Sequence, residues 1–274
     1  MELEPHAFEG TAPYYTIGRP PYSEQLAPTL AQEAGLDGRG QLLDVGCGPG
    51  VLALELSSLF TSTVALDPEP GMLSEGKRRA ELAGVENIHW IEKMAEDIPT
   101  LGVGSCKLVT FGQSFHRVQR HQVAEYVYDV LEPGGAIALI AHAVEGRPEP
   151  EGPRYPRIPD TEVKELIIRF LGDDTRRYLA TWAQNPIERF EDTLAGTRFR
   201  TSRVVFAPGR PDLVRDIDSV VAGYFSMSYA APRHFGDERD HFQSALRQLL
   251  LHRSPEGLFW DWPGDTEIVL AVKN

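Results

Sequence analysis

A glycine-rich turn that directly follows a short apolar run is the stretch of this sequence best suited to bind a ligand. The pattern predicts a buried strand over residues 41–45, a tight turn over residues 46–50 and a helix over residues 51–60. Glycine allows a sharp turn and lets a ligand approach the backbone with no Cβ in the way, and a helix N-terminus offers unpaired N–H groups. The sequence therefore predicts a nucleotide-binding corner.

The spacing of the glycines distinguishes between two kinds of nucleotide. A dinucleotide-binding turn requires glycine at its first, third and sixth positions, and the sixth position here is Val51. This residue argues against an NAD-dependent oxidoreductase. Glycines at Gly46, Gly48 and Gly50, with Asp44 two residues before the first, are instead the pattern of S-adenosylmethionine (SAM) binding.

Asp67 is the strongest single candidate for contact with the cofactor. It follows a predicted strand over residues 63–66 and stands 21 residues beyond Gly46. The second strand of such a sheet places a carboxylate on ribose hydroxyls at about this separation. We therefore expect Asp67 to bind the ribose.

Strands and helices alternate along the chain. Strands are predicted over residues 41–45, 63–66, 88–91, 107–111, 136–141, 199–206 and 266–272. Helices are predicted over residues 22–35, 51–60, 71–83, 161–171, 175–183, 212–226 and 239–252. A further helix is predicted to end at Pro133-Gly134-Gly135, and a loop is predicted over residues 147–159. This order predicts an α/β fold with a Rossmann-like, doubly wound, mostly parallel seven-stranded sheet.

The predicted domain organisation has two parts. Residues 1–40 form an N-terminal aromatic arm and helix, and two prolines after Arg19 place Tyr14 and Tyr15 on an irregular arm or a short helix. Residues 41–274 form the SAM-binding domain. Helical insertions at about 145–195 and 210–256 are expected to make a lid, because the latter is too long for a simple connection and has helical periodicity.

Composition excludes several classes of partner. A formal net charge of −13 would repel a phosphate backbone, so nucleic acid and anionic membrane are poor partners. No apolar run is long enough for a secretory signal or a membrane span. The two cysteines imply neither a disulfide framework nor a metal site and favour a reducing cytoplasm. Homo-oligomer formation is left open.

Three further landmarks give the sequence a family resemblance. They are Asp67 followed by Pro68, the Ala95-Glu96-Asp97 turn, and Leu131-Glu132-Pro133-Gly134-Gly135 before the fifth predicted strand. With the glycine corner, they resemble the class I SAM-dependent methyltransferases. The resemblance implies that Met72 packs on adenine, that Ala95 and Glu96 face the adenine edge, and that Gln113 lies beside the methionine part. The full set of predicted cofactor residues is Arg19, Asp44, Gly46, Cys47, Gly48, Gly50, Asp67, Pro68, Met72, Ala95, Glu96 and Gln113.

A narrower likeness is to small-molecule methyltransferases, among them lincosamide N-methyltransferases of antibiotic pathways. It is carried by the aromatic arm with Arg19-Pro20 and by Gln113-Ser114-Phe115-His116 after the fourth predicted strand. Many relatives carry tryptophan after Phe-His, whereas this chain has Arg117.

Methyl transfer from a sulfonium requires a nucleophile in line with the S–CH₃ bond and the exclusion of water, so positioning can supply most of the rate. The expected catalytic wall is Tyr14, Tyr15, Phe115 and His116. Each has a structural alternative: the tyrosines can pack the arm on the sheet, Phe115 can be a core residue, and His116 can be a structural histidine instead of a base. Arg19 can bind the SAM carboxylate or form a surface ion pair.

The sequence thus predicts a SAM-dependent methyltransferase that acts on a small-molecule acceptor. N-methylation of a secondary metabolite such as an antibiotic precursor is the preferred hypothesis. The alternatives are O-methylation of a hydroxyl or carboxylate, and a non-catalytic SAM-binding module.

Overall fold

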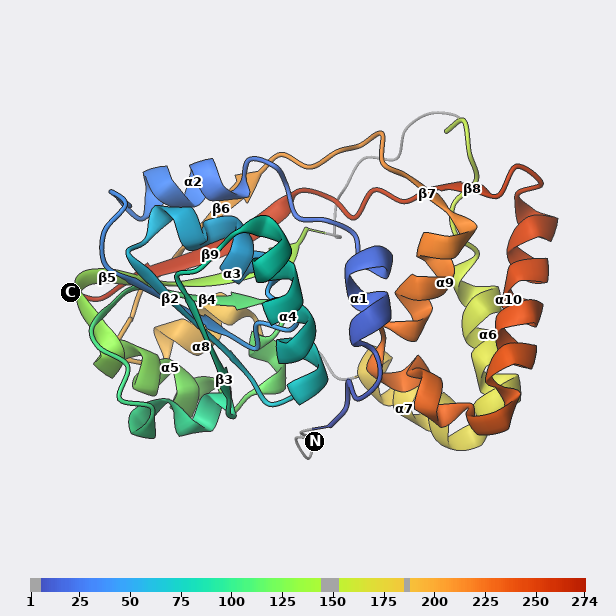
Figure 1. The fold of residues 1–274 in the computed structure, drawn as a ribbon, viewed down its shortest axis with the longest axis horizontal. Helices are drawn as coiled ribbons and strands as arrows, with labels where there is room; N and C mark the ends of the chain where they lie inside the picture. Colours follow the sequence, from blue (N-terminus) through green and yellow to red (C-terminus); the bar gives the residue numbers. More distant parts are fainter. Residues whose placement is uncertain (1–5, 144–152, 185–187) are drawn as a thin grey trace.

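The computed structural model of the protein describes residues 6–143, 153–184 and 188–274. Figure 1 shows an elongated molecule with a twisted, helix-covered sheet at one end and a group of helices at the other. The helical end contains α6 (Asp160–Leu171), α7 (Asp173–Gln184), α9 (Ile217–Phe225) and α10 (Arg239–Arg253). Helix α1 (Ala12–Gly18) stands between the two ends in this view.

The main sheet has seven strands in the order β3-β2-β1-β4-β5-β9-β6. Their bounds are β1 (Gln41–Val45), β2 (Ser62–Asp67), β3 (Ile88–Glu92), β4 (Cys106–Gly112), β5 (Leu131–His142), β6 (Arg203–Ala207) and β9 (Thr266–Val272). The first five are parallel, and β9 runs antiparallel between β5 and β6. This arrangement confirms the predicted Rossmann-like, mostly parallel seven-stranded sheet.

Both faces of the sheet are buried, which explains why its strands are nearly continuous apolar runs. Neighbouring residues Leu42 and Leu43 belong to the cores on opposite faces. Helices α2 (Leu26–Glu33) and α3 (Val51–Leu56) contribute to the Leu42 face. Helices α5 (Arg120–Val130) and α8 (Phe190–Ala195) contribute to the Leu43 face. Helix α4 (Pro70–Ala83) packs over β2 and β3.

The sequence analysis expected Pro133-Gly134-Gly135 to end a helix, but in the structure this segment is part of a strand. Helix α5 already ends at Val130, and β5 includes all three residues. The strand makes an irregularity there, because its register with β4 shifts between the pairs Cys106↔Leu131 and Leu108↔Ala136. Gly134 has a φ of +81°, a conformation that favours glycine. Proline and glycine therefore mark a bulge in this strand.

Three other expected elements begin later than predicted, and one of them is the helix expected from residue 22, which begins at Leu26. Strand β6 begins at Arg203, since Phe199 is buried in the core and Arg200 has a φ of +62°. The helix expected from residue 212 begins at Ile217, where the Asp216 side chain accepts a hydrogen bond from the Ser219 backbone N–H at 2.8 Å.

A small second sheet was not predicted from the sequence. The residues before helix α9 form β7 (Val214–Asp216), which pairs antiparallel with β8 (Leu258–Trp260). Both strands are only three residues long and lie far apart in sequence. A local pattern therefore carries too little signal to predict their pairing.

The N-terminal segment is shared between the two ends of the molecule. Helix α2 packs against the sheet, whereas the α1 residue Tyr14 packs on Phe225 of α9 with 5.1 Å between ring centroids. A Cβ added to Gly18 would lie 2.2 Å from the Ala222 carbonyl carbon, so the backbones of α1 and α9 touch. The division into an arm and a domain with lid insertions stays a prediction; residues 145–152 and 185–187 of those insertions, with part of the loop expected at 147–159, lie outside the described residues.

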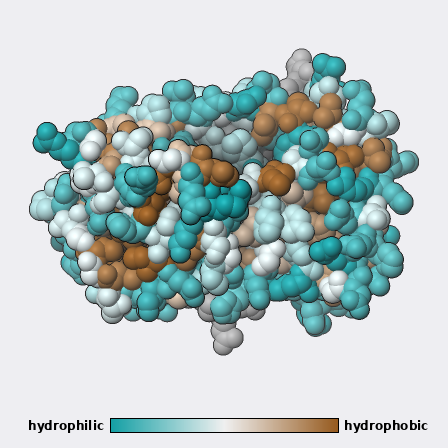
Figure 2. Space-filling model, in the orientation of Figure 1, coloured by the Kyte–Doolittle hydropathy of each residue, from teal (hydrophilic) through white to brown (hydrophobic). Residues whose placement is uncertain are grey.

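The face of the molecule drawn in Figure 2 is largely hydrophilic, with hydrophobic residues in small separate patches. Within residues 6–143, 153–184 and 188–274, none of the helices has both the length and the apolar character needed to cross a bilayer.

Candidate active site

A pocket of about 630 Å³ lies where the carboxyl ends of the parallel strands face the helical end. Open α/β sheets bind their ligands at this edge. The strand ends and the turns after them supply Val45, Gly46, Gly48, Asp67, Pro68, Glu69, Met72, Lys93, Met94, Ala95, Glu96, Gly112, Gln113, Ser114, Arg117 and Val118. The N-terminal segment supplies Ala7, Phe8 and Tyr15, and the helical end supplies Leu171, Asp174, Thr175, Tyr178, Ser228, Tyr229 and His234.

The three glycines of the corner are needed for different reasons. Gly48 lines the pocket, and a Cβ added there would meet no atom within 4 Å, so its backbone is open to a ligand. Gly46 also lines the pocket, but a Cβ there would lie 2.6 Å from the Ser114 Cβ. Gly50 does not line the pocket, because it packs against Trp90, whose ring would lie 2.4 Å from an added Cβ. Only the first two glycines can approach a ligand directly.

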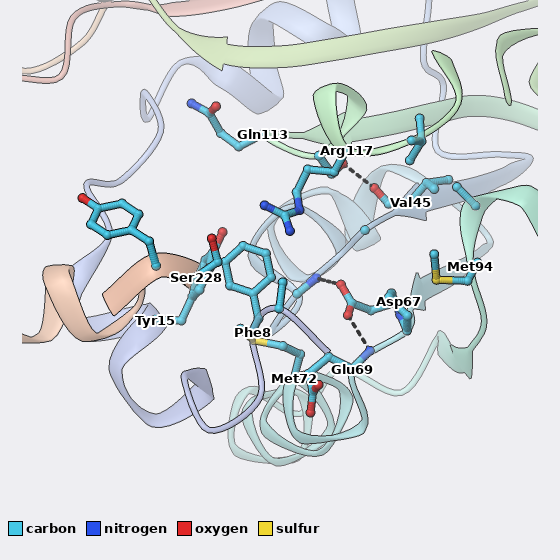
Figure 3. Close-up of a pocket in the computed structure, with 18 of the residues that line it drawn as sticks. Phe8, Tyr15, Val45, Asp67, Glu69, Met72, Met94, Gln113, Arg117 and Ser228 are labelled. Atoms are coloured by element: carbon cyan, nitrogen blue, oxygen red, sulfur yellow. Dashed lines mark hydrogen bonds between the residues drawn. The ribbon is translucent and has the colours of Figure 1, made fainter. Parts of the chain in front are cut away.

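Asp67 lies at the end of β2 with its carboxylate against the glycine corner. Its Oδ2 accepts a hydrogen bond from the Gly48 N–H at 2.8 Å, and its Oδ1 accepts one from the Glu69 N–H at 2.9 Å (Figure 3). Burial raises the pKa of this carboxyl to about 6, although both hydrogen bonds oppose the shift. Each oxygen retains capacity for a second hydrogen bond, so the group can also accept ligand hydroxyls.

Asp44 and Cys47 lie behind the pocket wall. The Asp44 carboxylate accepts hydrogen bonds from the Thr110 hydroxyl at 2.8 Å and the Ala53 N–H at 3.1 Å. Burial raises the pKa of Asp44 to about 7. The Cys47 thiol is buried and free, and neither residue lines the pocket. Asp44 therefore ties β1 to β4 and α3, while the cofactor contact expected of both residues stays a prediction.

Two buried carboxylate oxygens in the pocket wall have no hydrogen-bond partner among the described residues. Glu96 accepts a hydrogen bond from the Gln119 N–H at 3.0 Å through Oε1, while its Oε2 is unsatisfied. Glu69 accepts one from the Gly71 N–H through Oε1, while its buried Oε2 has only His6 nearby, at 3.8 Å. A buried acceptor without a donor is costly, so both positions suit a ligand with N–H or O–H groups.

The turn after β4 presents Gln113 to the pocket in an unusual backbone conformation. Gln113 has a φ of +55°, although it is not glycine. Its N–H donates to the Ile140 carbonyl at 2.9 Å, and the next residue, Ser114, donates its hydroxyl to the Val45 carbonyl at 2.7 Å. These bonds join the turn to β5 and β1, and so fix the place where Gln113 and Arg117 enter the pocket (Figure 3).

Three of the four expected catalytic residues do not line the pocket. Tyr14 packs in the helical core against Phe225. Phe115 is only 1% exposed and lies in the sheet core, with ring centroids 5.0 Å from Phe111 and 5.5 Å from Phe190. His116 lies outside the lining as well, and burial together with the Arg117 charge lowers its pKa to about 4. Of the four, only Tyr15 reaches the pocket.

Arg19 lines a second cavity, of about 530 Å³, instead of this pocket. Its Nη2 donates to the Ser226 carbonyl at 2.9 Å, and its guanidinium lies 5.0 Å from the Tyr15 ring centroid. The N-terminal arm thus uses this arginine to bind the end of helix α9, and its contact with the cofactor carboxylate stays a prediction.

The residues that sequence reasoning missed come mainly from segments far from the glycine corner. Phe8 lies in the expected arm but was not among the predicted site residues, and Tyr178, Tyr229 and His234 belong to the late insertions. None lies in a motif whose spacing has a chemical meaning. Arg117 did carry a signal, because it stands where the resembling proteins carry an aromatic residue.

Comparison with known proteins identifies the sheet domain. Residues 42–135 match the model of a methyltransferase domain family. A probable S-adenosylmethionine-dependent methyltransferase of Saccharomyces cerevisiae, CRG1, is 21% identical over 181 residues, which cover 64% of this chain and 59% of that protein. The methyltransferase cfoB of Aspergillus candidus is 26% identical over 161 residues, which cover 57% of this chain and 47% of that protein. The chain spans about half the length of the curated relatives it matches.

The solved structure of the [4+2]-cyclase SpnF has a TM-score of 0.53 with this chain at 15% identity. The match covers 98% of this chain and 95% of SpnF. At this identity, the likeness shows the fold alone. The matched domain and the strand order fit a protein that binds SAM. The buried carboxylates that follow β2 and β3 fit this cofactor as well. Residues 42–135 are thus a methyltransferase domain, and the chain is similar to SAM-dependent methyltransferases.

Proposed function

We propose that the protein transfers the methyl group of SAM to a small-molecule acceptor. The observation that carries this proposal is a pocket of about 630 Å³ with two unlike walls. One wall, here called the sheet wall, consists of Gly46, Gly48, Asp67, Ala95, Glu96 and Gln113. The other, here called the helical wall, consists of Leu171, Asp174, Thr175, Tyr178, Ser228, Tyr229 and His234.

The residues of the sheet wall would hold the cofactor. Asp67 would accept hydrogen bonds from the ribose hydroxyls, and the open Gly48 backbone would let the ligand approach closely. The unsatisfied Glu96 Oε2 would accept a donor at the adenine end, where buried Met72 offers an apolar surface. When bound, SAM supplies an electrophilic methyl group on a sulfonium.

The helical wall, with Phe8 and Tyr15, would hold the acceptor and exclude water. Aromatic side chains combine large apolar contacts with hydroxyl groups at the tyrosines, so they can orient a small molecule without taking part in bond making. Orientation of the two reactants is the main requirement of this chemistry, since no covalent intermediate on the protein is needed.

N-methylation of a secondary metabolite, such as an antibiotic precursor, is the preferred reaction. An amine can lose its proton to solvent before it enters the pocket and then needs no base. His116 is outside the lining, and its lowered pKa keeps the imidazole neutral. Methylation of an alcohol would need a base close to the hydroxyl, and His234 or Asp174 of the helical wall would have to serve as that base. O-methylation of a carboxylate, which is already a nucleophile, is the alternative that needs none.

We also propose a compartment and exclude two classes of acceptor, on the grounds of the charge and the thiols. A formal net charge of −13 supports an acceptor that is neither nucleic acid nor a membrane lipid surface. Cys47 and Cys106 are both free and buried, which supports activity in a reducing cytoplasm.

Two measurements test the proposal. Calorimetric titration should give binding of SAM and of its product S-adenosylhomocysteine (SAH), and no binding of NAD. Release of SAH should then depend on acceptor in a panel of amines, alcohols and carboxylates. Failure to bind SAM or SAH would overturn the proposal. Binding without turnover of any acceptor would leave a non-catalytic SAM-binding module.

A further inference from the structure

Arg117 places a positive charge in the pocket that the described part of the protein does not pair. It belongs to η3 (Phe115–Arg117), lines the pocket and is partly buried. Its backbone N–H donates to the Ser114 carbonyl at 2.9 Å. Within residues 6–143, 153–184 and 188–274, its guanidinium forms neither a hydrogen bond nor an ion pair, and its defined contact is with the Phe8 ring at 4.7 Å.

The position of this charge is fixed by the packing around it. Buried Phe115 anchors the short helix in the sheet core, while the Ser114 hydroxyl joins the preceding turn to β1. On the other side, Arg233 donates hydrogen bonds to the carbonyls of His6, at 2.7 Å, and Glu9, at 3.1 Å, and so holds Phe8 in place. Figure 3 shows the guanidinium extending into the pocket between Gln113 and Asp67.

A guanidinium held on an aromatic face retains its N–H edges for a ligand. Its planar donors match a carboxylate, which can accept two parallel hydrogen bonds. A partly buried charge is unfavourable unless an anion pairs with it. The Arg117 charge acts on Asp67 from a distance and lowers the pKa of that carboxyl, but among the described residues the two side chains form neither a hydrogen bond nor a salt bridge. The missing partner is therefore a ligand anion.

The acceptor is the better source of that anion than the cofactor. The cofactor sulfonium is itself a cation, and a second positive charge near it is unfavourable unless a negative charge lies close by. An anionic acceptor would supply that charge. In addition, the guanidinium extends from the sheet wall to Phe8, which the helical end holds through Arg233 and which we assign to the acceptor.

We propose that Arg117 binds a carboxylate of the methyl acceptor and so selects carboxylate-bearing small molecules. This inference rests on the proposed function and narrows its substrate class. It is compatible with N-methylation of an amine that also carries a carboxylate. It is also compatible with methylation of the carboxylate itself, in which an O–CH₃ bond forms, the S–CH₃ bond breaks with its electron pair left on sulfur, and no proton moves.

Benzoate and benzamide are suitable probes, because they have nearly the same shape and differ in charge. Calorimetry would measure their binding to the SAH-loaded wild-type protein and to Arg117→Met, Arg117→Lys and Arg78→Met. The last variant is a matched control, since Arg78 pairs with Glu75 on the exposed face of α4, away from the pocket. SAH affinity and thermal unfolding would be measured for every variant.

We expect the wild type and Arg78→Met to bind benzoate about tenfold more tightly than benzamide. Arg117→Met should bind the two equally, and Arg117→Lys should keep part of the preference because it keeps the charge without the planar fork. All four proteins should bind SAH with similar affinity. If Arg117→Met does not fold, the result for Arg117→Lys decides, because an unreduced preference in that variant would count against the planar fork.

Three results would overturn the inference. The first is equal binding of benzoate and benzamide by the wild type, and the second is a preference that survives in Arg117→Met. The third is a large loss of SAH affinity in Arg117→Met, whatever happens to the benzoate preference, which would make the cofactor carboxylate the partner. Absence of SAH binding to the wild type is a different outcome, because it removes the proposed function itself.

Discussion

The sheet wall and the helical wall of the pocket are held in place by different means. Sheet-wall residues sit at strand ends, and backbone hydrogen bonds such as Gly48 N–H to Asp67 fix them. In the helical wall, Ser228 and Tyr229 follow α9, which belongs to the hydrophobic core of the helical end. Tyr178 lies on α7, and its ring centroid is 6.4 Å from that of Tyr229. The contrast teaches that one side of a pocket can be rigidly fixed by the backbone of a sheet, while the opposite side is shaped by the packing of late helices.

Phe115→Ala should have a larger effect than any other substitution proposed below, and it should act on stability. Phe115 is fully enclosed by the sheet core, so truncation would leave a cavity and lower the free energy of unfolding by about 3–5 kcal/mol. Urea unfolding followed by circular dichroism would measure this. Normal stability combined with lost turnover would return Phe115 to the acceptor site and blur the distinction between the walls.

Asp67→Ala should weaken SAH binding by about 1–3 kcal/mol, because the ribose hydroxyls lose a charged acceptor. The same carboxylate also holds the Gly48 and Glu69 N–H groups, so the corner should loosen as well. Isothermal calorimetry would measure the dissociation constant, with Asp67→Asn as the variant of matched size. An unchanged constant in a folded variant would remove Asp67 from the cofactor site.

The pH dependence of SAH binding should sharpen the assignment of Asp67. Burial raises the pKa of this carboxyl to about 6, so it is ionised at pH 7 and protonated at pH 5. SAH affinity should fall by up to about tenfold for each pH unit below 6, as the carboxylate is lost. The free energy of unfolding should change in the opposite direction to SAH affinity. Because the pKa is raised, the folded state binds more protons than the unfolded state between about pH 4 and 6, so the contribution of Asp67 to stability grows as pH falls.

Asp67→Asn is the control for the pH dependence of SAH binding and for that of stability, because it removes the titrating group. Its SAH affinity should be nearly flat from about pH 7 to pH 5, and the difference in stability between it and the wild type should vary across the same window. Parallel curves for the two proteins would show that another carboxyl controls binding.

The smallest expected effect is on the helical wall. Tyr178→Ala should lower kcat/KM for the acceptor, since it removes one aromatic contact. The loss should correspond to about 1 kcal/mol of transition-state stabilisation. SAH affinity should stay unchanged. Steady-state kinetics and calorimetry on one preparation would measure both. A loss of SAH affinity as large as that of Asp67→Ala would mean that the two walls share the cofactor.

Much of the sheet could be predicted from the sequence, because its signals are local. Apolar runs fix β1 to β4, and β9 has the bounds that the pattern predicted. Gly46, Gly48, Asp67 and Gln113 meet in the pocket because the carboxyl ends of parallel strands meet at one edge. The roles of these residues remain predictions, whereas their proximity is a property of the fold.

The failures have physical causes too. A residue beside a strand end can point into the core or into the pocket, and the chemistry of Phe115 fits both, so its sequence could not decide. Pro-Gly-Gly stops a helix in one context and forms a bulge in another, and here its pairing with β4 decides. The pairing of β7 with β8, such as Val214↔Trp260, depends on segments distant in sequence.

The contact between α1 and α9 has a consequence for how the chain folds as it is made. Strands β1 to β5 follow one another between residues 41 and 142, so most of the sheet can assemble from neighbouring segments. Gly18, by contrast, meets Ala222 and Gly223, about two hundred positions later in the chain. Contacts of such long range form slowly. On a ribosome, α1 must therefore wait without its partner until α9 has emerged, and the helical wall of the pocket is completed after the sheet wall.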